Sequence, residues 1–145
     1  MHAVRRWDLS GRGGQHDVTH RFPITVYYED TDMGGVVYHA NFLRFIERAR
    51  SDYVRRLGVD QNAMRDAGVV WVVTRIEADY LSPARFEDEL TVETVPEKMT
   101  TARLTMSQIV RREGRELFSA KVTAVCMDMH SGKPVRLPAE VRASL

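Results

Sequence analysis

The chain has 145 residues, of which 28% are charged and 43% apolar, and 21 Lys and Arg against 20 Asp and Glu leave a formal net charge of +1. This balance gives no argument for a nucleic-acid partner, and no apolar run approaches the roughly 18 residues that a membrane span needs. Because the single Cys126 excludes an internal disulfide and no Cys or His cluster has zinc spacing, we expect one cytoplasmic globular domain without a metal site.

Residues 1–20 contain several glycines and arginines but no apolar stretch typical of a secretory signal. We interpret them as a flexible N-terminal tail that precedes one folded domain, residues 21–145. Trp7 is the one large aromatic side chain of this tail. A single aromatic residue is weak evidence that a tail docks on its domain.

A strand is predicted over residues 21–28, because β-branched and aromatic residues alternate there with other residues. The side chains expected on one face of this strand are Phe22, Ile24, Val26 and Tyr28. A glycine-containing loop follows at residues 29–35. From Ala40 the apolar spacing changes to three and four, which predicts a helix over residues 40–57 with a length of about 27 Å.

A short helix is expected around residues 61–67. Four strand-like segments follow it, at residues 69–81, 89–95, 101–112 and 115–129. Glu113 and Gly114 predict a tight hairpin between the last two strands, and Pro83 and Pro96 predict the other breaks. One long helix against a mainly antiparallel five-stranded sheet is an α+β fold, and it excludes a doubly wound nucleotide-binding fold.

The loop that joins the first strand to the long helix holds two carboxylates, Asp30 and Asp32, and two glycines, Gly34 and Gly35. Glycine allows a sharp turn and a close approach of a ligand to the backbone. The helix start leaves N–H groups without intrahelical partners, which can stabilise a developing oxyanion. With a carboxylate that attacks the substrate or activates water, this combination suits transfer of an acyl group to water.

Ordinary turn chemistry is a second interpretation of this loop, because aspartate side chains in such turns cap backbone N–H groups. Three sharper alternatives fail on spacing or fold. A calcium loop that began at Asp30 needs a glutamate where Asn41 stands. A phosphatase of this kind needs a parallel α/β sheet, and a paired-carboxylate protease needs aspartates that meet across a cleft.

Residues 27–50, YYEDTDMGGVVYHANFLRFIERAR, resemble the signature of the hotdog-fold acyl-CoA thioesterases of the 4-hydroxybenzoyl-CoA thioesterase family. They are most similar to the bacterial branch associated with the tol-pal system. Residues 79–85, DYLSPAR, resemble a second stretch of that branch. The resemblance extends over residues 21–138. It implies a hotdog fold and hydrolysis of an acyl-CoA to a free acid and coenzyme A, without a cofactor.

By this resemblance Asp32 matches the catalytic aspartate, which acts as a nucleophile or as a general base toward water. His39 matches the residue at the helix start whose backbone N–H polarises the thioester carbonyl. Tyr38 and Asn41 match positions beside the acyl pocket, and Gly35 lets the substrate approach the backbone. The family also implies a homodimer or tetramer with active sites at the subunit interface. Coenzyme A and acyl carrier protein both stay open as the acyl carrier.

Two other functions stay open at this point. A hotdog dehydratase for hydroxyacyl thioesters depends on a histidine side chain, here that of His39, and yields an enoyl product. A non-catalytic module that binds an acyl thioester or an acyl carrier protein leaves its ligand unchanged.

Several residues outside the loop have more ordinary interpretations. Glu47 is interpreted as a paired or solvated helix residue, and Trp71 and Cys126 as core residues. The phosphates of coenzyme A favour basic residues at the rim of a site. The candidates, among which the sequence does not choose, are Arg75, Arg85, Lys98, Arg103, Arg111 and Arg112.

Overall fold

The computed structural model describes residues 19–144, so Trp7 and nearly all of the expected tail lie outside the described residues. The elements, in chain order, are β1 (His20–Thr25), the 3₁₀ turn η1 (Tyr28–Asp30), α1 (His39–Arg56), α2 (Gln61–Asp66), β2 (Val69–Tyr80), β3 (Glu89–Met99), β4 (Arg103–Arg112), β5 (Arg115–Asp128), β6 (Pro134–Val135) and α3 (Ala139–Arg142). None of the described helices is long and apolar enough to cross a membrane.

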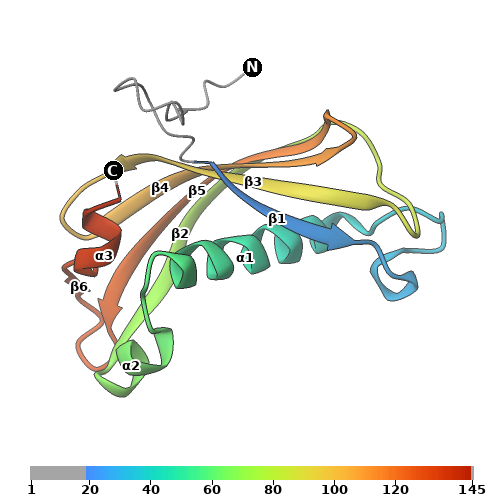
Figure 1. The fold of residues 1–145 in the computed structure, drawn as a ribbon. Coiled ribbons are helices and arrows are strands. Elements are labelled where there is room, and N and C mark those ends of the chain that lie inside the picture. Colours follow the sequence, from blue (N-terminus) through green and yellow to red (C-terminus); the bar gives the residue numbers. More distant parts are fainter. Residues whose placement is uncertain (1–18, 145) are drawn as a thin grey trace, which may run out of the picture.

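The strands form one antiparallel sheet in the order β1-β3-β4-β5-β2, and the short β6 pairs with β5. Helix α1 runs along one side of this sheet (Figure 1) and packs on β1, β3 and β4. The predicted α+β architecture is therefore confirmed. The predicted number of five strands is wrong by one, because β6 has two residues and is too short to show alternation.

The first strand ends earlier than its sequence pattern predicts. Strand β1 stops at Thr25, and Tyr28 lies in η1 with 78% of its surface exposed. The cause is local: Asp30 accepts a hydrogen bond from the Tyr27 N–H through its carboxylate (2.8 Å) and donates its own N–H to the Tyr27 carbonyl (3.0 Å). These bonds turn the chain, so Tyr28 does not share the buried face of Ile24.

Pro96 does not end a strand, which corrects the prediction of a break there. Strand β3 continues to Met99, with a register shift between Pro96 and Lys98. Such a bulge leaves a residue outside the ladder and so accommodates the N–H that proline lacks. The predicted hairpin is confirmed, since Glu113 and Gly114 have φ values of 50° and 82°, as the favoured two-residue turn requires.

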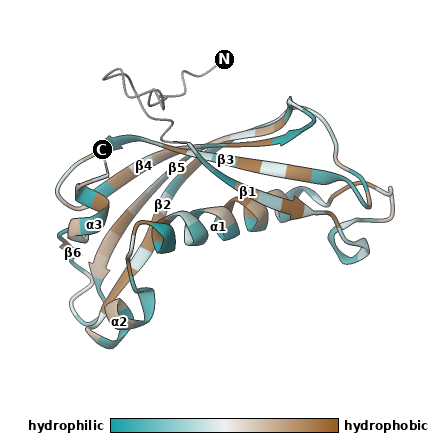
Figure 2. Cartoon of the chain, in the orientation of Figure 1, coloured by the Kyte–Doolittle hydropathy of each residue, from teal (hydrophilic) through white to brown (hydrophobic). Residues whose placement is uncertain are grey.

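The apolar stripe of α1 meets the sheet in two clusters. The first contains Phe42, Phe45 and Ile46, and the second contains Tyr53 with residues near the other end of the helix. Figure 2 shows hydrophobic and hydrophilic residues alternating along β3, as expected for a strand with one buried face. Cys126 belongs to the second cluster, and burial raises the pKa of its thiol to about 12. Its core assignment is therefore confirmed.

A buried ionic cluster connects β1 to the C-terminal part of α1. The Asp52 carboxylate, 6% exposed, lies 2.8 Å from Nε2 of His20, and Arg55 and Arg56 also contact it. Burial alone raises the pKa of Asp52. The His20 hydrogen bond and the two guanidinium groups outweigh burial, so the pKa lies below its ordinary value of 3.8.

We expect this cluster to make the folded state sensitive to acid. Because the folded pKa of Asp52 is lowered, the unfolded chain binds more protons in acid, and the stabilisation is present above pH 3.8 and lost as pH falls through the folded pKa. Asp52→Asn should lower the free energy of unfolding near neutral pH by about 1 to 3 kcal/mol. It should also flatten the decline of that free energy in acid.

Urea unfolding at neutral pH and in acid measures both effects. Asp66→Asn, which changes an exposed carboxylate of α2, is the matched control and should behave as wild type. An acid decline in Asp52→Asn as steep as in wild type contradicts the prediction.

Candidate active site

The loop between η1 and α1 is a compact turn. An isolated antiparallel β-bridge joins Thr31 to Val37, and the Asp32 N–H donates to the Val36 carbonyl at 2.9 Å. Gly35 donates its N–H to the Asp32 carbonyl at 3.0 Å and has a φ of 79°, a conformation that favours glycine. Apart from Gly35 and its two chain neighbours, no described atom lies within 4 Å of the position that a Cβ of Gly35 would take, so the backbone is open to a ligand there.

The Asp32 side chain is exposed, and one of its two carboxylate oxygens accepts a hydrogen bond. Its Oδ1 accepts a hydrogen bond from the Gly34 N–H at 2.8 Å. Its Oδ2 has no hydrogen-bond partner among residues 19–144. The turn interpretation therefore holds for one oxygen, and the other oxygen is available to a substrate or to water.

Asp30 and Asn41 hold the loop on the helix. Asp30 is 8% exposed, and its carbonyl accepts hydrogen bonds from the Tyr38 N–H (3.0 Å) and from the side-chain amide of Asn41 (2.9 Å). In this single copy the side-chain amide of Asn41 therefore holds the turn on the helix. The sequence predicts that Asn41 lies beside the acyl pocket. Of the two predicted carboxylates, Asp30 serves the turn and Asp32 faces outward.

The start of α1 presents two free backbone donors. The N–H groups of His39 and Ala40 have no acceptor among the described residues. They lie at the positive end of an 18-residue helix, where negative charge on an acyl oxygen is stabilised. The rings of His39 and the exposed Tyr38 pack at 4.4 Å between centroids, and the Tyr80 hydroxyl donates to the His39 carbonyl at 3.0 Å.

A cavity of about 290 Å³ opens beside this helix start. Its lining residues are Val37, His39, Phe42, Tyr80, Leu81, Ser82 and Pro83. The rings of Phe42 and Tyr80 lie edge to face at 5.9 Å and both pack on Phe118. The structure therefore brings His39 to a cavity, whereas Asp32 does not line it. The sequence pattern assigns no role to Tyr80, although the DYLSPAR segment marks its position.

The chain after β2 covers the turn. The Val37 N–H donates to the Ala84 carbonyl at 2.7 Å, and the backbone of Arg85 forms an isolated antiparallel β-bridge with Val36. Asp88 fixes this crossing, because it accepts hydrogen bonds from the Arg85 N–H (2.8 Å) and from Arg112 Nη1 (2.6 Å).

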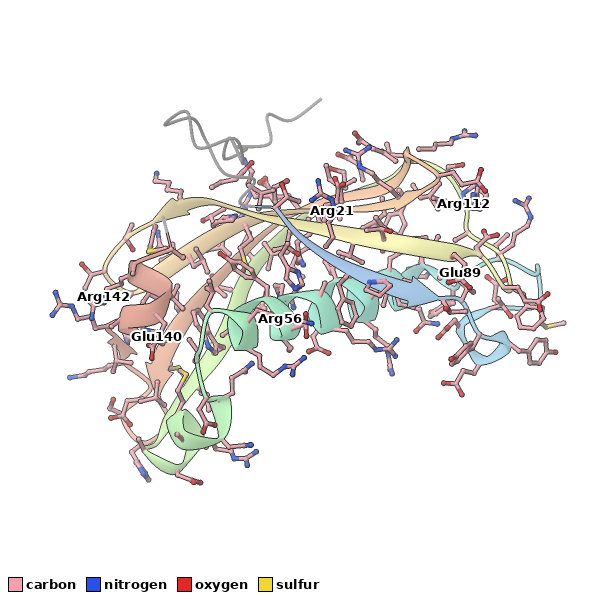
Figure 3. All side chains as sticks on the ribbon, viewed as in Figure 1. Arg21, Arg56, Glu89, Arg112, Glu140 and Arg142 are labelled. Carbon is pink, nitrogen blue, oxygen red and sulfur yellow. The ribbon has the colours of Figure 1, made fainter. Side chains whose placement is uncertain are left out.

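Burial alone raises the pKa of Asp88, but the Arg85 N–H and the Arg112 guanidinium outweigh it and hold the pKa below its ordinary value. Figure 3 shows Arg112 at the same end of the sheet as Glu89, where β3 begins. The Arg112 charge is therefore already engaged by the protein.

The basic residues that the sequence suggests for phosphate binding lie in three different surroundings. Arg111 is held by Glu93 at 2.8 Å, so the pair Arg111 and Arg112 is engaged in ion pairs. Arg75, Lys98 and Arg103 line a cavity of about 420 Å³ together with threonines of β4 and β5. Arg85 alone of the candidates lies against the turn that contains Asp32.

Several large apolar side chains are exposed on the segments next to the helix start. They belong to the turn and to the segment that covers it, and they are Tyr27, Tyr28, Met33, Tyr38, Tyr80, Leu81 and Phe86. Tyr28 and Phe86 contact each other edge to face, with 6.0 Å between ring centroids. The described residues contain no group of three or more His, Cys, Asp and Glu side chains arranged to hold a metal ion.

Two relatives among known proteins are similar over most of their length. Acyl-CoA thioesterase YbgC from Haemophilus influenzae is 41% identical over 124 residues, which are 85% of this chain and 91% of that protein. The 1,4-dihydroxy-2-naphthoyl-CoA hydrolase from Thermosynechococcus vestitus is 31% identical over 116 residues, 79% of this chain and 80% of that protein.

Structure and family comparisons agree with these relatives. The crystal structure of a probable thioesterase from Bartonella henselae superposes with a TM-score of 0.78 at 35% identity, over 83% of this chain and 99% of that one. The model of the thioesterase-like superfamily matches residues 26–145. The chain therefore belongs to the thioesterase-like superfamily and has the hotdog fold of its thioesterases.

Proposed function

We propose that the protein is a cytoplasmic acyl-CoA thioesterase, which hydrolyses an acyl thioester to a free acid and coenzyme A. The observation that carries the proposal is the helix start, where the free N–H groups of His39 and Ala40 lie beside a cavity. The turn that leads into it carries Asp32 with one free carboxylate oxygen. The name of the Haemophilus influenzae relative, 41% identical, supports the same activity.

The chemistry follows from these groups. Asp32 attacks the thioester carbonyl, or it removes a proton from the water that does so. Either route builds negative charge on the acyl oxygen, which the His39 N–H and the helix dipole stabilise. Loss of one such donor in other enzymes costs about 3 to 4 kcal/mol. When Asp32 attacks, the C–S bond breaks as an anhydride forms between the acyl group and Asp32, and water then hydrolyses this anhydride and regenerates Asp32. When Asp32 acts as a base, water adds to the carbonyl directly and the C–S bond breaks from the resulting adduct. In both routes a proton from water reaches the departing thiolate, coenzyme A leaves as its thiol, and no metal or redox cofactor is needed.

The other predicted site residues take supporting roles in this proposal. Gly35 leaves the backbone of the turn open to the substrate, and the ring of Tyr38 shields the helix start. Asn41 fixes the turn on α1 through the Asp30 carbonyl. The His39 side chain orients the loop, and its backbone N–H does the electrostatic work.

We propose further that two copies pair through β2. This strand is an edge of the sheet, has 12 residues, and exposes every residue from 73 to 80. An edge strand with unpaired backbone groups favours pairing with another strand. Val73, Ile76 and Tyr80 are apolar, exposed, and on the sheet face that carries α1, since they pair with the buried Ala124, Val122 and Phe118. A second copy covers them all.

Antiparallel pairing about a two-fold axis at the middle of β2 sets the end of one strand beside the start of the other. Tyr80 and the helix start of one copy then face Val69 of its partner. Each active site is completed by the partner subunit, and the two sheets join into one. Analytical ultracentrifugation distinguishes this dimer from a tetramer that consists of two such dimers.

A panel of acyl-CoA and acyl-carrier-protein thioesters, assayed by thiol release and by mass spectrometry of the products, tests the proposed activity. Thiol and free acid in equimolar amounts support it. An enoyl thioester as product identifies a dehydratase instead. Thermal stabilisation by an acyl-CoA that stays intact identifies a binding module.

A further inference from the structure

Tyr80, the last residue of β2, is hydrogen-bonded to the first turn of α1. Its hydroxyl donates to the His39 carbonyl at 3.0 Å, across 41 residues of sequence. Packing of the ring does not require this hydroxyl, because a phenylalanine presents the same ring. The bond therefore points to a task of Tyr80 beyond packing.

The ring of Tyr80 contacts three other rings, although 49% of the residue is exposed. The centroid distances are 4.9 Å to Phe118, 5.9 Å to Phe42 and 6.2 Å to His39, and all three contacts are edge to face. Tyr80 is also the partner of Phe118 in the ladder between β2 and β5. The packed rings hold the hydroxyl in place, so it reaches the helix without reorganisation.

The acceptor of this bond belongs to the same peptide group as one of the free donors of the helix start. The His39 carbonyl and the Ala40 N–H are the two ends of one planar amide, and the Ala40 N–H has no acceptor among residues 19–144. Because resonance couples the two ends, a bond donated to the oxygen makes the N–H a stronger donor. Tyr80 therefore acts on the Ala40 N–H through this amide.

The same bond restrains the orientation of the amide. The first turn of a helix lacks ladder partners for its N–H groups, and helix ends fray. The Tyr80 hydroxyl supplies a bond to this turn from the end of β2. In the preceding amide, which contains the His39 N–H, the Tyr38 carbonyl accepts from the Asn41 N–H at 2.8 Å. Both free donors thus belong to amides whose carbonyls are held by a hydrogen bond.

We propose that Tyr80 is a positioning residue of the thioesterase reaction: its hydroxyl orients and polarises the His39–Ala40 amide, so that the Ala40 N–H donates to the acyl oxygen. This inference rests on the proposed function, and it adds a second backbone donor to the His39 N–H. Negative charge on the acyl oxygen grows between the bound thioester and the transition state. The contribution of this donor is therefore expected in kcat rather than in KM.

Tyr80→Phe tests the proposal, because it removes the hydroxyl and keeps the ring. With an acyl-CoA that wild type hydrolyses, kcat should fall about 3- to 10-fold, the range for one hydrogen bond between neutral groups, with little change in KM. Replacement of Tyr80 by 3-fluorotyrosine, whose phenol is a stronger donor, should raise kcat above the wild-type value. Tyr28→Phe, which removes an exposed phenol hydroxyl from η1, is the matched control and should keep wild-type kcat.

Infrared difference spectroscopy gives a readout that a purely structural tyrosine would not change. An acyl-CoA with an isotope-labelled thioester carbonyl, bound to the slow Asp32→Asn variant, should show its carbonyl stretch at lower frequency than in solution, because the helix start polarises the bond. Addition of Tyr80→Phe to that variant should reverse part of the shift.

The outcomes separate this inference from the proposed function. Wild-type kcat in a folded Tyr80→Phe protein, or the same carbonyl stretch with and without the hydroxyl, overturns the role of Tyr80 alone. If wild type hydrolyses no acyl thioester, the proposed function is removed and the inference with it. If Tyr80→Phe does not fold, the 3-fluorotyrosine protein decides: a kcat above wild type supports the proposal, and a kcat equal to or below wild type overturns it.

Discussion

Asp32→Asn should lower kcat for acyl-CoA hydrolysis by about 10²- to 10⁴-fold, the range expected for loss of a positioned general base. Asparagine keeps an oxygen that accepts the Gly34 N–H, so the turn should persist. It lacks the charge and basicity that attack on the thioester or activation of water requires. The variant therefore separates the catalytic role of Asp32 from its structural one.

Thiol release under saturating acyl-CoA measures this effect, and circular dichroism and thermal unfolding verify the fold. Glu29→Gln, which removes an exposed carboxylate from the neighbouring η1, is the matched control and should keep full activity. Undiminished turnover in a folded Asp32→Asn protein would falsify the assignment of this residue.

In the dimer that we propose, Ile76→Lys should separate the two copies into monomers and abolish most of the activity. Ile76 is 37% exposed in the single copy and lies near the middle of β2, where a two-fold axis brings both copies of the residue close together. Two like charges placed there without counter-charges cost several kcal/mol of association free energy. Activity should fall together with the dimer, because the proposed pairing completes each site with the partner's half of β2.

Analytical ultracentrifugation and the acyl-CoA assay, run on the same samples, test both halves of this prediction. Glu77→Lys places the same side chain on the opposite face of β2 and should leave assembly and turnover intact. A folded Ile76→Lys monomer with wild-type kcat/KM would show that one copy holds a complete site, and it would contradict the shared site.

The arrangement of the single copy agrees with a shared site. The free oxygen of Asp32, the free N–H groups of the helix start and the exposed Tyr80 all lie at one end of α1.

Local patterns determined the elements of this fold. The spacing of Phe42, Phe45, Ile46 and Ala49 decided α1 to within one residue at each end, because one helix face must be buried. Glu113 and Gly114 decided the hairpin, because few residue pairs adopt its backbone angles. The boundaries that differ, at Tyr28 and Pro96, depend on a side-chain hydrogen bond and on a bulge that periodicity does not encode.

The sequence by itself also determined which groups meet in the turn, since its carboxylates, glycines and helix start are neighbours along the chain. Only the tertiary structure decided which groups share a cavity. Tyr80 reaches His39 across 41 residues of sequence, and Arg50 reaches Gln108 across 58. Such contacts follow from the packing of β2 and β4 around α1, and their positions are set by sheet register and burial rather than by any local preference of the residues concerned.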